Sequence, residues 1–425
     1  MSKPYVTLLG KAVRRIAMLR GGGSALPGLF VEKIDPDFIK RTLAQLSGGV
    51  VVISGTNGKT TTTKMTVELL ESQGLKVFTN RTGSNFTRGV AAALLGEVDN
   101  NGILDADIAV LELDEAHAVH FVKTIAPRYS LLLNVMRDQL DRFGEIDATA
   151  KLLQQIANAT TDTVVLNRED PRITAIASLL GTQNITYFGL SPELRQLFPN
   201  DDDMRGAKTT SSKAKQPEAD VTLTKLNGNT AQFAIDGKNV TTTLELQGVY
   251  NIYNAAAALA LVRTIVGKAL DQPKLIEALS QVTPAFGRGE TVQIGGQPLE
   301  IVLVKNPSGF RLSLSSFKPE GYKTMIAIND NYADGRDMSW LWDVDFDSLR
   351  EGGVLEVTGI RAFDMALRLQ YDEITVSHIS TDIAASLQQF IASAPTQPKR
   401  IFCTYTAMLA IRRELAKITD VEKIS

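Results

Sequence analysis

The stretch Val50-Val51-Val52-Ile53-Ser54-Gly55-Thr56-Asn57-Gly58-Lys59-Thr60-Thr61-Thr62-Thr63 decides the fold of this chain of 425 residues. Four branched apolar residues, Val50 to Ile53, predict a short strand that is buried on both faces of a sheet. Gly55 and Gly58 then permit a tight turn, and the pattern after Lys59 predicts a helix. A strand, a glycine turn and a helix N-terminus together form a cradle for a phosphate group.

This turn predicts seven residues that bind the phosphates of a nucleotide: Gly55, Thr56, Asn57, Gly58, Lys59, Thr60 and Thr61. Backbone N–H groups and the helix dipole would face the anion, Lys59 would place a charge on the β- and γ-phosphates, and the Thr60 hydroxyl would ligate Mg²⁺. The stretch is shorter than the full P-loop, which needs glycine at the position of Ile53. A glycine turn between a strand and a helix occurs in any doubly wound protein. We favour the nucleotide site because Lys-Thr follows the second glycine directly.

Composition excludes some classes of function. With 45 basic and 47 acidic residues the net charge is −2, which gives no electrostatic case for nucleic acid as a partner. The length favours two or three domains. The single cysteine, Cys403, excludes an intramolecular disulfide and a cysteine zinc site, and it indicates a reducing compartment, so we expect a cytoplasmic protein.

The N-terminal segment, Met1 to Arg20, is amphipathic and basic. Its apolar stretches are too short for a signal peptide or a transmembrane helix. Two interpretations stay open, an ordinary surface helix, which we favour, and a helix that lies on a membrane surface. Leu26-Pro27-Gly28 is expected to end this helix.

Apolar runs separated by helical patterns continue along the chain, and they predict strands at Leu75–Thr79, Asp107–Leu113, Tyr129–Asn134, Thr163–Asn167 and Asn184–Phe188. This alternation is typical of an α/β fold with a parallel sheet and right-handed crossovers. We predict two domains, residues 1–295 with the ATP-binding loop and residues 296–425 as a Rossmann-like α/β domain. Residues 191–219, rich in Asp, Lys, Ser and Thr, are expected to be a surface insertion, and the two hairpin turns Asn227-Gly228 and Asp236-Gly237 follow it.

Polar clusters follow several predicted strands, at the edge where α/β sheets bind ligands. They start at Asn80, Glu112, Asn134 and Asn167. Alternation along the strand would put Glu112 and Asp114 on one side, as a pair of carboxylates that faces a metal ion.

In the last third, the stretch from Asn329 to Asp343 combines four carboxylates, an arginine and both tryptophans in one loop after a strand. A solvated turn explains an Asp-Gly pair but not two tryptophans, so we predict a binding or catalytic role.

The compact form Gly-Thr-Asn-Gly-Lys-Thr-Thr-Thr resembles the nucleotide loop of the Mur ligase superfamily, which forms amide bonds with ATP. By that resemblance Glu112 matches the acidic ligand of Mg²⁺, and Asn134…Asp138-Gln139-Leu140-Asp141 matches a family motif in which Gln139 replaces a histidine. Gly248 to Ala255 resembles the adenine-binding segment, which implies nucleotide contacts for Asn251 and Asn254. Phe286-Gly287-Arg288-Gly289-Glu290 resembles the segment whose arginine, here Arg288, closes the central domain over ATP.

The block Asp334-Gly335-Arg336-Asp337-Met338-Ser339-Trp340 narrows this to a resemblance with the MurT family, over nearly the whole chain. The resemblance implies the synthetase subunit of lipid II isoglutaminyl synthase, which amidates the D-glutamate α-carboxyl of lipid II at the inner membrane face through an acyl phosphate. Ammonia would come from a GatD-type glutaminase subunit, and Asp337 would be the catalytic residue that completes its Cys-His pair. The cofactors implied are ATP and Mg²⁺. Relatives often carry a four-cysteine zinc ribbon near the insertion, but none is expected here because that segment has no cysteine.

The residues themselves also indicate a partner, because this chain has one cysteine without a glycine-framed nucleophile elbow, and glutamine hydrolysis needs a Cys-His pair. Two alternatives stay open. One is a Mur or folylpolyglutamate type of ligase that adds an amino acid. The other is a nucleotide-binding scaffold without activity, which the retained Lys59, Thr60 and Glu112 oppose.

Overall fold

The computed structural model describes residues 4–19, 26–80, 86–137, 146–198, 216–246, 248–283, 288–317 and 319–419, with the side chains of 17–19, 288 and 289 left out. The chain forms two compact units. The first comprises Met1–Met136, Ile146–Leu246 and Asn251–Val282, and the second consists mainly of Thr283–Ser425. The sequence placed the boundary at residue 296 instead. The second unit begins earlier because the strand from Arg288 to Ile294 pairs with the strand that follows it.

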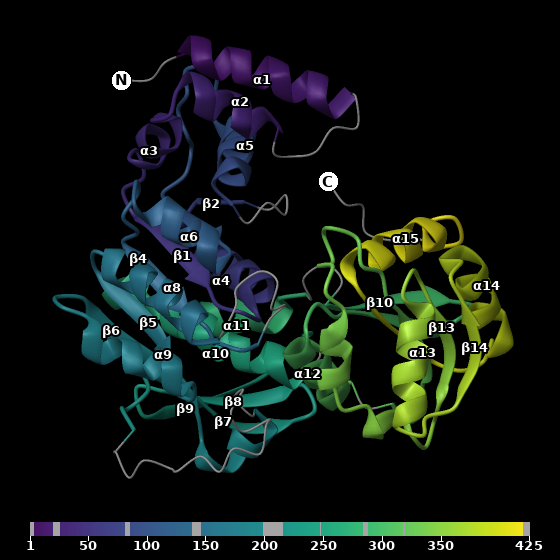
Figure 1. Ribbon diagram of the computed structural model, residues 1–425. Coiled ribbons are helices and arrows are strands. Elements are labelled where there is room, and N and C mark those ends of the chain that lie inside the picture. The colour runs from purple at the N-terminus through teal and green to yellow at the C-terminus, as the bar shows by residue number, and fades with distance from the viewer. Residues whose placement is uncertain are drawn as a thin grey trace. The chain divides into compact units, whose positions relative to one another are not determined.

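The first unit (Figure 1) contains, in chain order, α1 (Pro4–Leu19), α2 (Leu26–Ile34), α3 (Phe38–Leu43), β1 (Gly49–Ser54), α4 (Lys59–Ser72), β2 (Val77–Thr79), α5 (Thr87–Glu97), β3 (Ile108–Glu112), α6 (Glu115–Val122), β4 (Tyr129–Leu132), α8 (Ile146–Ala159), β5 (Thr163–Asn167), α9 (Pro171–Ile176), β6 (Asn184–Leu190), β7 (Val221–Asn227), β8 (Thr230–Ile235), β9 (Lys238–Thr243), α10 (Val249–Val266) and α11 (Gln272–Gln281).

Its sheet has nine strands in the order β2-β3-β1-β4-β5-β6-β7-β8-β9. The strands from β2 to β7 run parallel, and β7, β8 and β9 form antiparallel hairpins. Val51, Val52 and Ile53 of β1 are fully buried, as expected for a central strand covered on both faces. The prediction of an α/β fold with a parallel sheet is confirmed.

The second hairpin turn is where the sequence placed it, whereas the first is Gly228-Asn229, one residue later than predicted, because Asn227 still belongs to β7. Asp236 and Gly237 have φ of 49° and 72°, which matches the mirror-image turn that Asp-Gly favours between antiparallel strands. The prediction for Pro27 is wrong, because a second helix, α2, begins at Leu26. Proline is tolerated in the first turn of a helix, where its missing N–H has no partner to lose.

The second unit contains β10 (Arg288–Ile294), β11 (Gln297–Leu303), α12 (Pro307–Ser316), β12 (Lys323–Ala327), η5 (Ser339–Asp343), η6 (Asp347–Leu349), β13 (Val354–Thr358), α13 (Ala362–Tyr371), β14 (Val376–Ser380), α14 (Ile383–Ser393), β15 (Lys399–Cys403) and α15 (Tyr405–Leu415). Its six strands have the order β10-β11-β15-β12-β13-β14, and all pairs except β10 and β11 are parallel. The predicted Rossmann-like α/β architecture therefore describes this unit.

One helix, α10, deserves comparison with a membrane span. Together with the turn after it, Val249–Ala269 is long and apolar enough to cross a bilayer, but 61% of its most apolar window is buried inside the protein. Its run from Ala255 to Ala260 lies in the core, where small side chains permit close packing. We therefore interpret α10 as a core helix of the first unit.

Candidate functional site

The glycine turn after β1 has the backbone that its sequence demands. Gly55 and Gly58 have φ of 136° and 89°, a region that other residues rarely adopt. A Cβ on Gly55 would lie 3.0 Å from the Asn134 nitrogen, and one on Gly58 would lie 2.8 Å from Asn254 Oδ1. Both glycines are therefore needed for conformation and for close approach of neighbouring segments.

The segment after β4 holds this turn in place. The Asn57 amide donates to Asn134 Oδ1, and Asn134 Nδ2 donates back to the Asn57 carbonyl, each at 2.9 Å. The Met136 amide donates to Thr56 Oγ1 at 3.0 Å, and that hydroxyl donates to the Met136 carbonyl at 3.2 Å. The loop is fixed before any ligand arrives, which is what a preorganised phosphate cradle needs.

Lys59 folds back over the turn. Its Nζ donates to the carbonyls of Gly55 and Thr56 at 2.5 and 3.2 Å, and it lies 3.5 Å from Glu115 Oε2. The lysine side chain is 12% exposed and Glu115 only 2%. The ammonium therefore sits at the mouth of the turn, within reach of an anion placed there.

The sequence did not single out Glu115. Burial raises the pKa of Glu115 to about 7, with the Lys59 charge opposing the rise and neighbouring Asp114 adding to it. A carboxyl that titrates near neutrality beside the phosphate-loop lysine is typical of functional sites. The signal available was its place within the acidic cluster that begins at Glu112.

Thr60 and Glu112, which the sequence predicts as metal ligands, lie next to each other. The Thr60 hydroxyl donates to Glu112 Oε1 at 2.9 Å. Asn80 fixes the end of β3, since its Nδ2 donates to the Glu112 carbonyl and its Oδ1 accepts the Glu112 amide, at 2.9 and 3.0 Å. A hydroxyl and a carboxylate are the hard oxygen donors that Mg²⁺ prefers, so these two residues fit that ion.

The predicted pairing of Glu112 with Asp114 stays a prediction, because β3 ends at Glu112 and alternation along a strand no longer specifies the side that Asp114 faces. Asp114 is the residue that precedes α6, and it lies beside Glu115.

The predicted adenine-binding segment forms the first turns of α10. Asn251 lies in the first turn and is half-buried, while Asn254 contacts the phosphate turn at Gly58. Tyr253 between them is buried, and its hydroxyl donates to Asn167 Oδ1 at 2.6 Å. The start of α10 is thereby fixed between β5 and the phosphate turn.

Of the other predicted residues, the structure describes Thr61 in full but not the side chain of Arg288 or the motif from Asp138 to Asp141. Thr61 lies in the first turn of α4 with a buried hydroxyl, so its backbone N–H is the group that can face a phosphate. Arg288 begins β10 in the second unit, and its side chain lies outside the description, as do residues 81–85, 138–145 and 284–287. The predictions for the motif Asp138 to Asp141 and for the closing arginine stay predictions.

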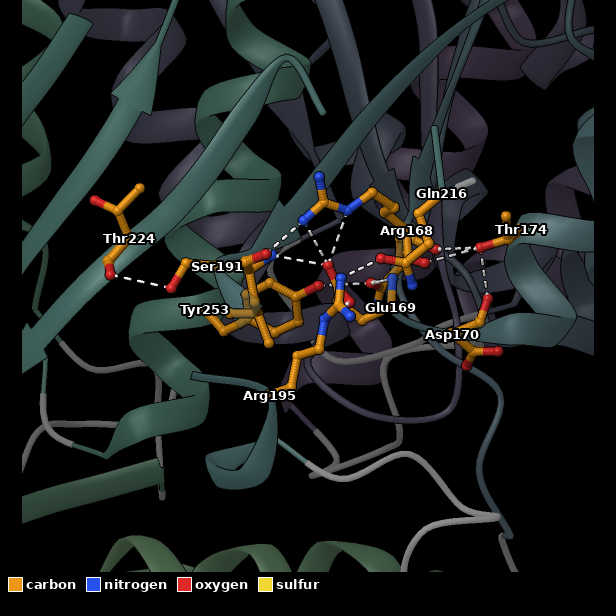
Figure 2. A network of polar contacts seen from close by, with 11 residues as sticks. Arg168, Glu169, Asp170, Thr174, Ser191, Arg195, Gln216, Thr224 and Tyr253 are labelled. Atoms are coloured by element: carbon orange, nitrogen blue, oxygen red, sulfur yellow. Dashed lines mark hydrogen bonds and ion pairs between the residues drawn. The ribbon is translucent and has the colours of Figure 1, made fainter. Parts of the chain in front are cut away.

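The polar cluster after β5 is a structural network (Figure 2). The Glu169 carboxylate accepts from Arg168 Nε at 2.9 Å and from the Leu190 amide at 3.0 Å, and it pairs with Arg195 at 3.0 Å. Asp170 caps α9 and accepts the Val135 amide at 2.7 Å, and burial raises its pKa to about 6. These contacts connect β5 and β6 to the segment after β4, which explains the cluster without a ligand.

In the second unit, Asp334 anchors the loop that follows β12. It is 5% exposed, and its carboxylate accepts the Thr406 amide at 2.7 Å, the Thr406 hydroxyl at 2.5 Å and the Asn331 amide at 3.1 Å. Burial raises the pKa of Asp334. The first part of the predicted block therefore has a structural role, joining the loop to the start of α15.

Asp337, three residues later, is only partly buried. Its Oδ1 accepts the Ser339 amide at 2.9 Å, and hydrogen bonds from the Ser339 hydroxyl and amide hold its pKa below the usual value. The carboxylate is therefore ionised at neutral pH and accessible to another molecule. The two tryptophans separate, since Trp340 is 4% exposed in the core and Trp342 is 49% exposed.

An apolar surface lies next to this loop. It consists of Phe363, Leu367 and Tyr371 of α13, Ile360 just before that helix and Trp342 of η5, and each is between 49% and 70% exposed. Trp342 packs on Tyr371 with ring centroids 5.1 Å apart. We refer to these five residues as the α13 face, and large exposed apolar patches of this kind mark interaction sites.

Cys403 is fully buried at the end of β15, and burial raises the pKa of its thiol. This cysteine is a core residue of the second unit.

Comparison with known proteins agrees with this architecture. Residues 53–262 match the Mur ligase middle domain, and residues 303–408 match the MurT ligase C-terminal domain. The chain is 32% identical, over 98% of its length and 97% of the relative, to the lipid II isoglutaminyl synthase (glutamine-hydrolyzing) subunit MurT of Streptococcus pneumoniae.

Solved structures show the same fold at lower identity. A pseudomurein peptide ligase type C from Methanothermus fervidus superposes with a TM-score of 0.69 at 19% identity, covering 90% of this chain and 81% of that one. The MurF ligase of Thermotoga maritima, solved in complex with ADP, superposes with a TM-score of 0.67 at 19% identity, covering 90% and 83%.

Proposed function

The chain belongs to the MurT family, and on that premise we propose that it is the synthetase subunit of a lipid II isoglutaminyl synthase. The observation that carries the proposal is the similarity over 98% of the chain, which includes both the phosphate loop and the Asp337 block. The substrate is the D-glutamate α-carboxyl of lipid II, which lies at the cytoplasmic face of the membrane, and the protein acts in the cytoplasm.

The reaction has two steps. A carboxylate oxygen attacks the γ-phosphorus of ATP, ADP leaves, and an acyl phosphate forms. Ammonia then attacks the carbonyl carbon, inorganic phosphate leaves with the C–O bond electrons, and the nitrogen loses a proton to give the amide of D-isoglutamine. This chemistry needs positioning and charge stabilisation rather than a covalent enzyme residue.

This chain's residues would divide that work as follows. The amides of the turn from Gly55 to Thr61 and the Lys59 ammonium bind the phosphates, while Asn251 and Asn254 contact the nucleoside. Mg²⁺, held by Thr60 and Glu112, would neutralise charge on the phosphate oxygens. Glu115 holds Lys59 over the turn when no nucleotide is bound, at 3.5 Å.

Ammonia must come from another chain, because the one cysteine here is buried and its pKa is raised. We assign this role to a GatD-type glutaminase with a Cys-His pair. Asp337 would accept a hydrogen bond from that histidine and orient it, which suits an ionised, accessible carboxylate. The α13 face is adjacent through η5, which begins two residues after Asp337, so we place the glutaminase contact there.

An amidation assay tests the proposal. Purified chain is incubated with lipid II, ATP, Mg²⁺ and ammonium, and the product is analysed by mass spectrometry for exchange of a hydroxyl for an amide. Amide formation that needs ATP and ammonium is expected. Ligation of an amino acid instead would establish the amino-acid-adding alternative. If neither ammonium nor an amino acid is ligated, the result would favour a nucleotide-binding scaffold without activity.

A further inference from the structure

Helix α1 has two apolar faces, and the inner one is already occupied. Val6 and Thr7 are buried at 2%, and Val6 belongs to the same core cluster as Val31 of α2 and Leu95 of α5. A Cβ on Gly10 would lie 2.7 Å from both Val31 and Leu95 side chains, so glycine is what allows this close contact. Figure 1 shows α1 lying across α2 and α5 in the first unit.

The outer face is apolar too. Tyr5, Leu8, Leu9 and Ile16 are 66%, 52%, 49% and 52% exposed, and Ala12 is exposed between them. At 100° per residue these five positions fall within a 100° arc of the helix, on the side away from the buried Thr7 and Gly10. An isolated exposed leucine needs no explanation, but a continuous apolar arc on a helix that is already packed does.

Basic side chains border this outer face. Lys11 and Arg15 lie next to Leu8 on the helical wheel, and Arg14 is one position further toward the inner side. No Asp or Glu occurs in the sequence before Glu32. The carboxylate of Asp99 lies near these basic side chains. Hydrogen bonds from the Ile103 and Asn101 amides lower its pKa, and the charge of Lys11 makes a smaller contribution in the same direction.

The geometry points to an anionic bilayer surface as the partner of this outer face. Tyr5, Leu8, Leu9 and Ile16 would enter the boundary between headgroups and acyl chains, while Lys11 and Arg15 would contact anionic headgroups. This is the arrangement of helices that lie in the interface plane, with an apolar face and a basic polar border.

The α13 face provides an internal contrast that favours lipid over protein for α1. That face is bordered by both signs of charge, since Arg361 and Asp364 lie beside it with part-exposed side chains and pair with each other at 3.4 Å. Mixed charge suits a protein partner, whereas a border of basic groups on the helix itself suits an anionic surface. The inference does not rest on the proposed amidation, because bilayer binding needs neither ATP nor lipid II.

Vesicle sedimentation tests the inference with the full chain. The chain is mixed with vesicles of equal parts phosphatidylglycerol and phosphatidylcholine, or of phosphatidylcholine alone, without ATP. Stronger binding to the anionic vesicles, weakened by salt, is expected. The double variant Leu9→Gln/Ile16→Gln should bind at least about tenfold more weakly, because the apolar part of the contact is lost. Lys11→Gln/Arg15→Gln should lose about fivefold for each charge removed.

The matched control is Phe363→Gln/Leu367→Gln, which removes two apolar side chains that are at least as exposed, 65% and 49%, from the α13 face and should leave vesicle binding unchanged. Circular dichroism and melting temperature show that each variant is folded. Absence of binding to anionic vesicles overturns the inference, as does equal binding by the α1 variant. Self-association that depends on Leu9 and Ile16, in a chain that ignores vesicles, would assign the face to a second copy instead.

Discussion

Two loops carry the proposed chemistry, and they are built in opposite ways. The turn after β1 interlocks its functional side chains, with Lys59 against Glu115 at 3.5 Å and Thr60 against Glu112 at 2.9 Å. The loop after β12 buries Asp334 but leaves Asp337 accessible, and the Asp337 carboxylate accepts a hydrogen bond from the Ser339 amide. Each loop follows the carboxyl end of a strand in a parallel sheet.

The difference reflects what each loop has to meet. A phosphate is small and enters a turn whose amides and lysine must be in place beforehand, so the protein fixes them with buried contacts. A residue that completes a catalytic group on another chain has to be accessible at the surface. Only the residues that hold its loop in place can be buried. Asp334 and Asp337, three residues apart, divide these two tasks.

Lys59→Ala should have the largest effect. The variant lacks the ammonium that stabilises the negative charge of the transferring phosphoryl group. Ammonium-driven amidation should therefore fall on the order of a thousandfold. The variant should remain folded, because Glu115 has a pKa of about 7 even beside the lysine and can stay protonated without it. Binding of the glutaminase should also persist.

Lys64→Ala is the matched control for Lys59→Ala. It removes one lysine from the same helix, a residue that pairs with Glu68 at 3.8 Å on a part-exposed surface, and it should keep near-normal activity. Amidation that survives in Lys59→Ala would remove the phosphate-loop assignment.

Asp337→Asn should separate the two sources of ammonia. Glutamine-driven amidation by the complex should fall on the order of a hundredfold or more, since the partner's histidine loses its orienting carboxylate, while ammonium-driven amidation should change little. Asp345→Asn is the control, because Asp345 is exposed in the same unit and also accepts an amide two residues ahead at 2.9 Å. Equal loss with both ammonia sources would move Asp337 into the synthetase site.

Glu115 should make stability depend on pH. Its pKa is about 7 in the folded chain against 4.5 for the ordinary group, so the folded state holds this proton more tightly. The stability it contributes is present below about pH 4.5 and is lost as pH rises through about 7. The side chain of Glu115→Gln stays neutral at every pH. As the pH rises from about 4.5 to about 7, the variant should therefore become more stable relative to the natural chain, by about 3 kcal/mol in all.

Thermal unfolding followed at several pH values from about 5 to 8 measures this gain. The control Glu97→Gln changes an exposed carboxyl at the end of α5, and its melting curve should shift with pH in parallel with the natural chain. If Glu115→Gln also runs parallel, the carboxyl titrates at an ordinary pH and does not hold Lys59 as described.

Thr406→Val should have the smallest effect and should act on the second loop alone. It removes the hydroxyl that donates to Asp334, at a cost of about 1–2 kcal/mol, and it should loosen the segment that presents Asp337. Glutamine-driven amidation should drop severalfold, and Thr406→Ser should restore it because the hydroxyl returns. A defect of the same size in ammonium-driven amidation would argue against a role confined to this loop.

The fold could be predicted where structure depends on near neighbours. The alternation of strands and helices and the hairpin turn at Asp236-Gly237 are confirmed, because both follow from local spacing and backbone preference. The strand β10 was missed as part of the second sheet, since its place depends on pairing with β11. The helix α2 was missed because Pro27 was interpreted as an end rather than a first turn.

The turn after β1 and the start of α4 could be predicted from local sequence alone, because Gly55, Gly58, Lys59 and Thr60 encode both within six residues. Only the tertiary structure brought Glu115 to Lys59, Asn254 to Gly58 and Thr406 to Asp334. Those partners are separated by 56, 196 and 72 positions, and no local pattern specifies which distant residues will meet. The burial that raises the pKa of Glu115 likewise exists only once the chain has packed. The same is true of the exposure of the outer face of α1.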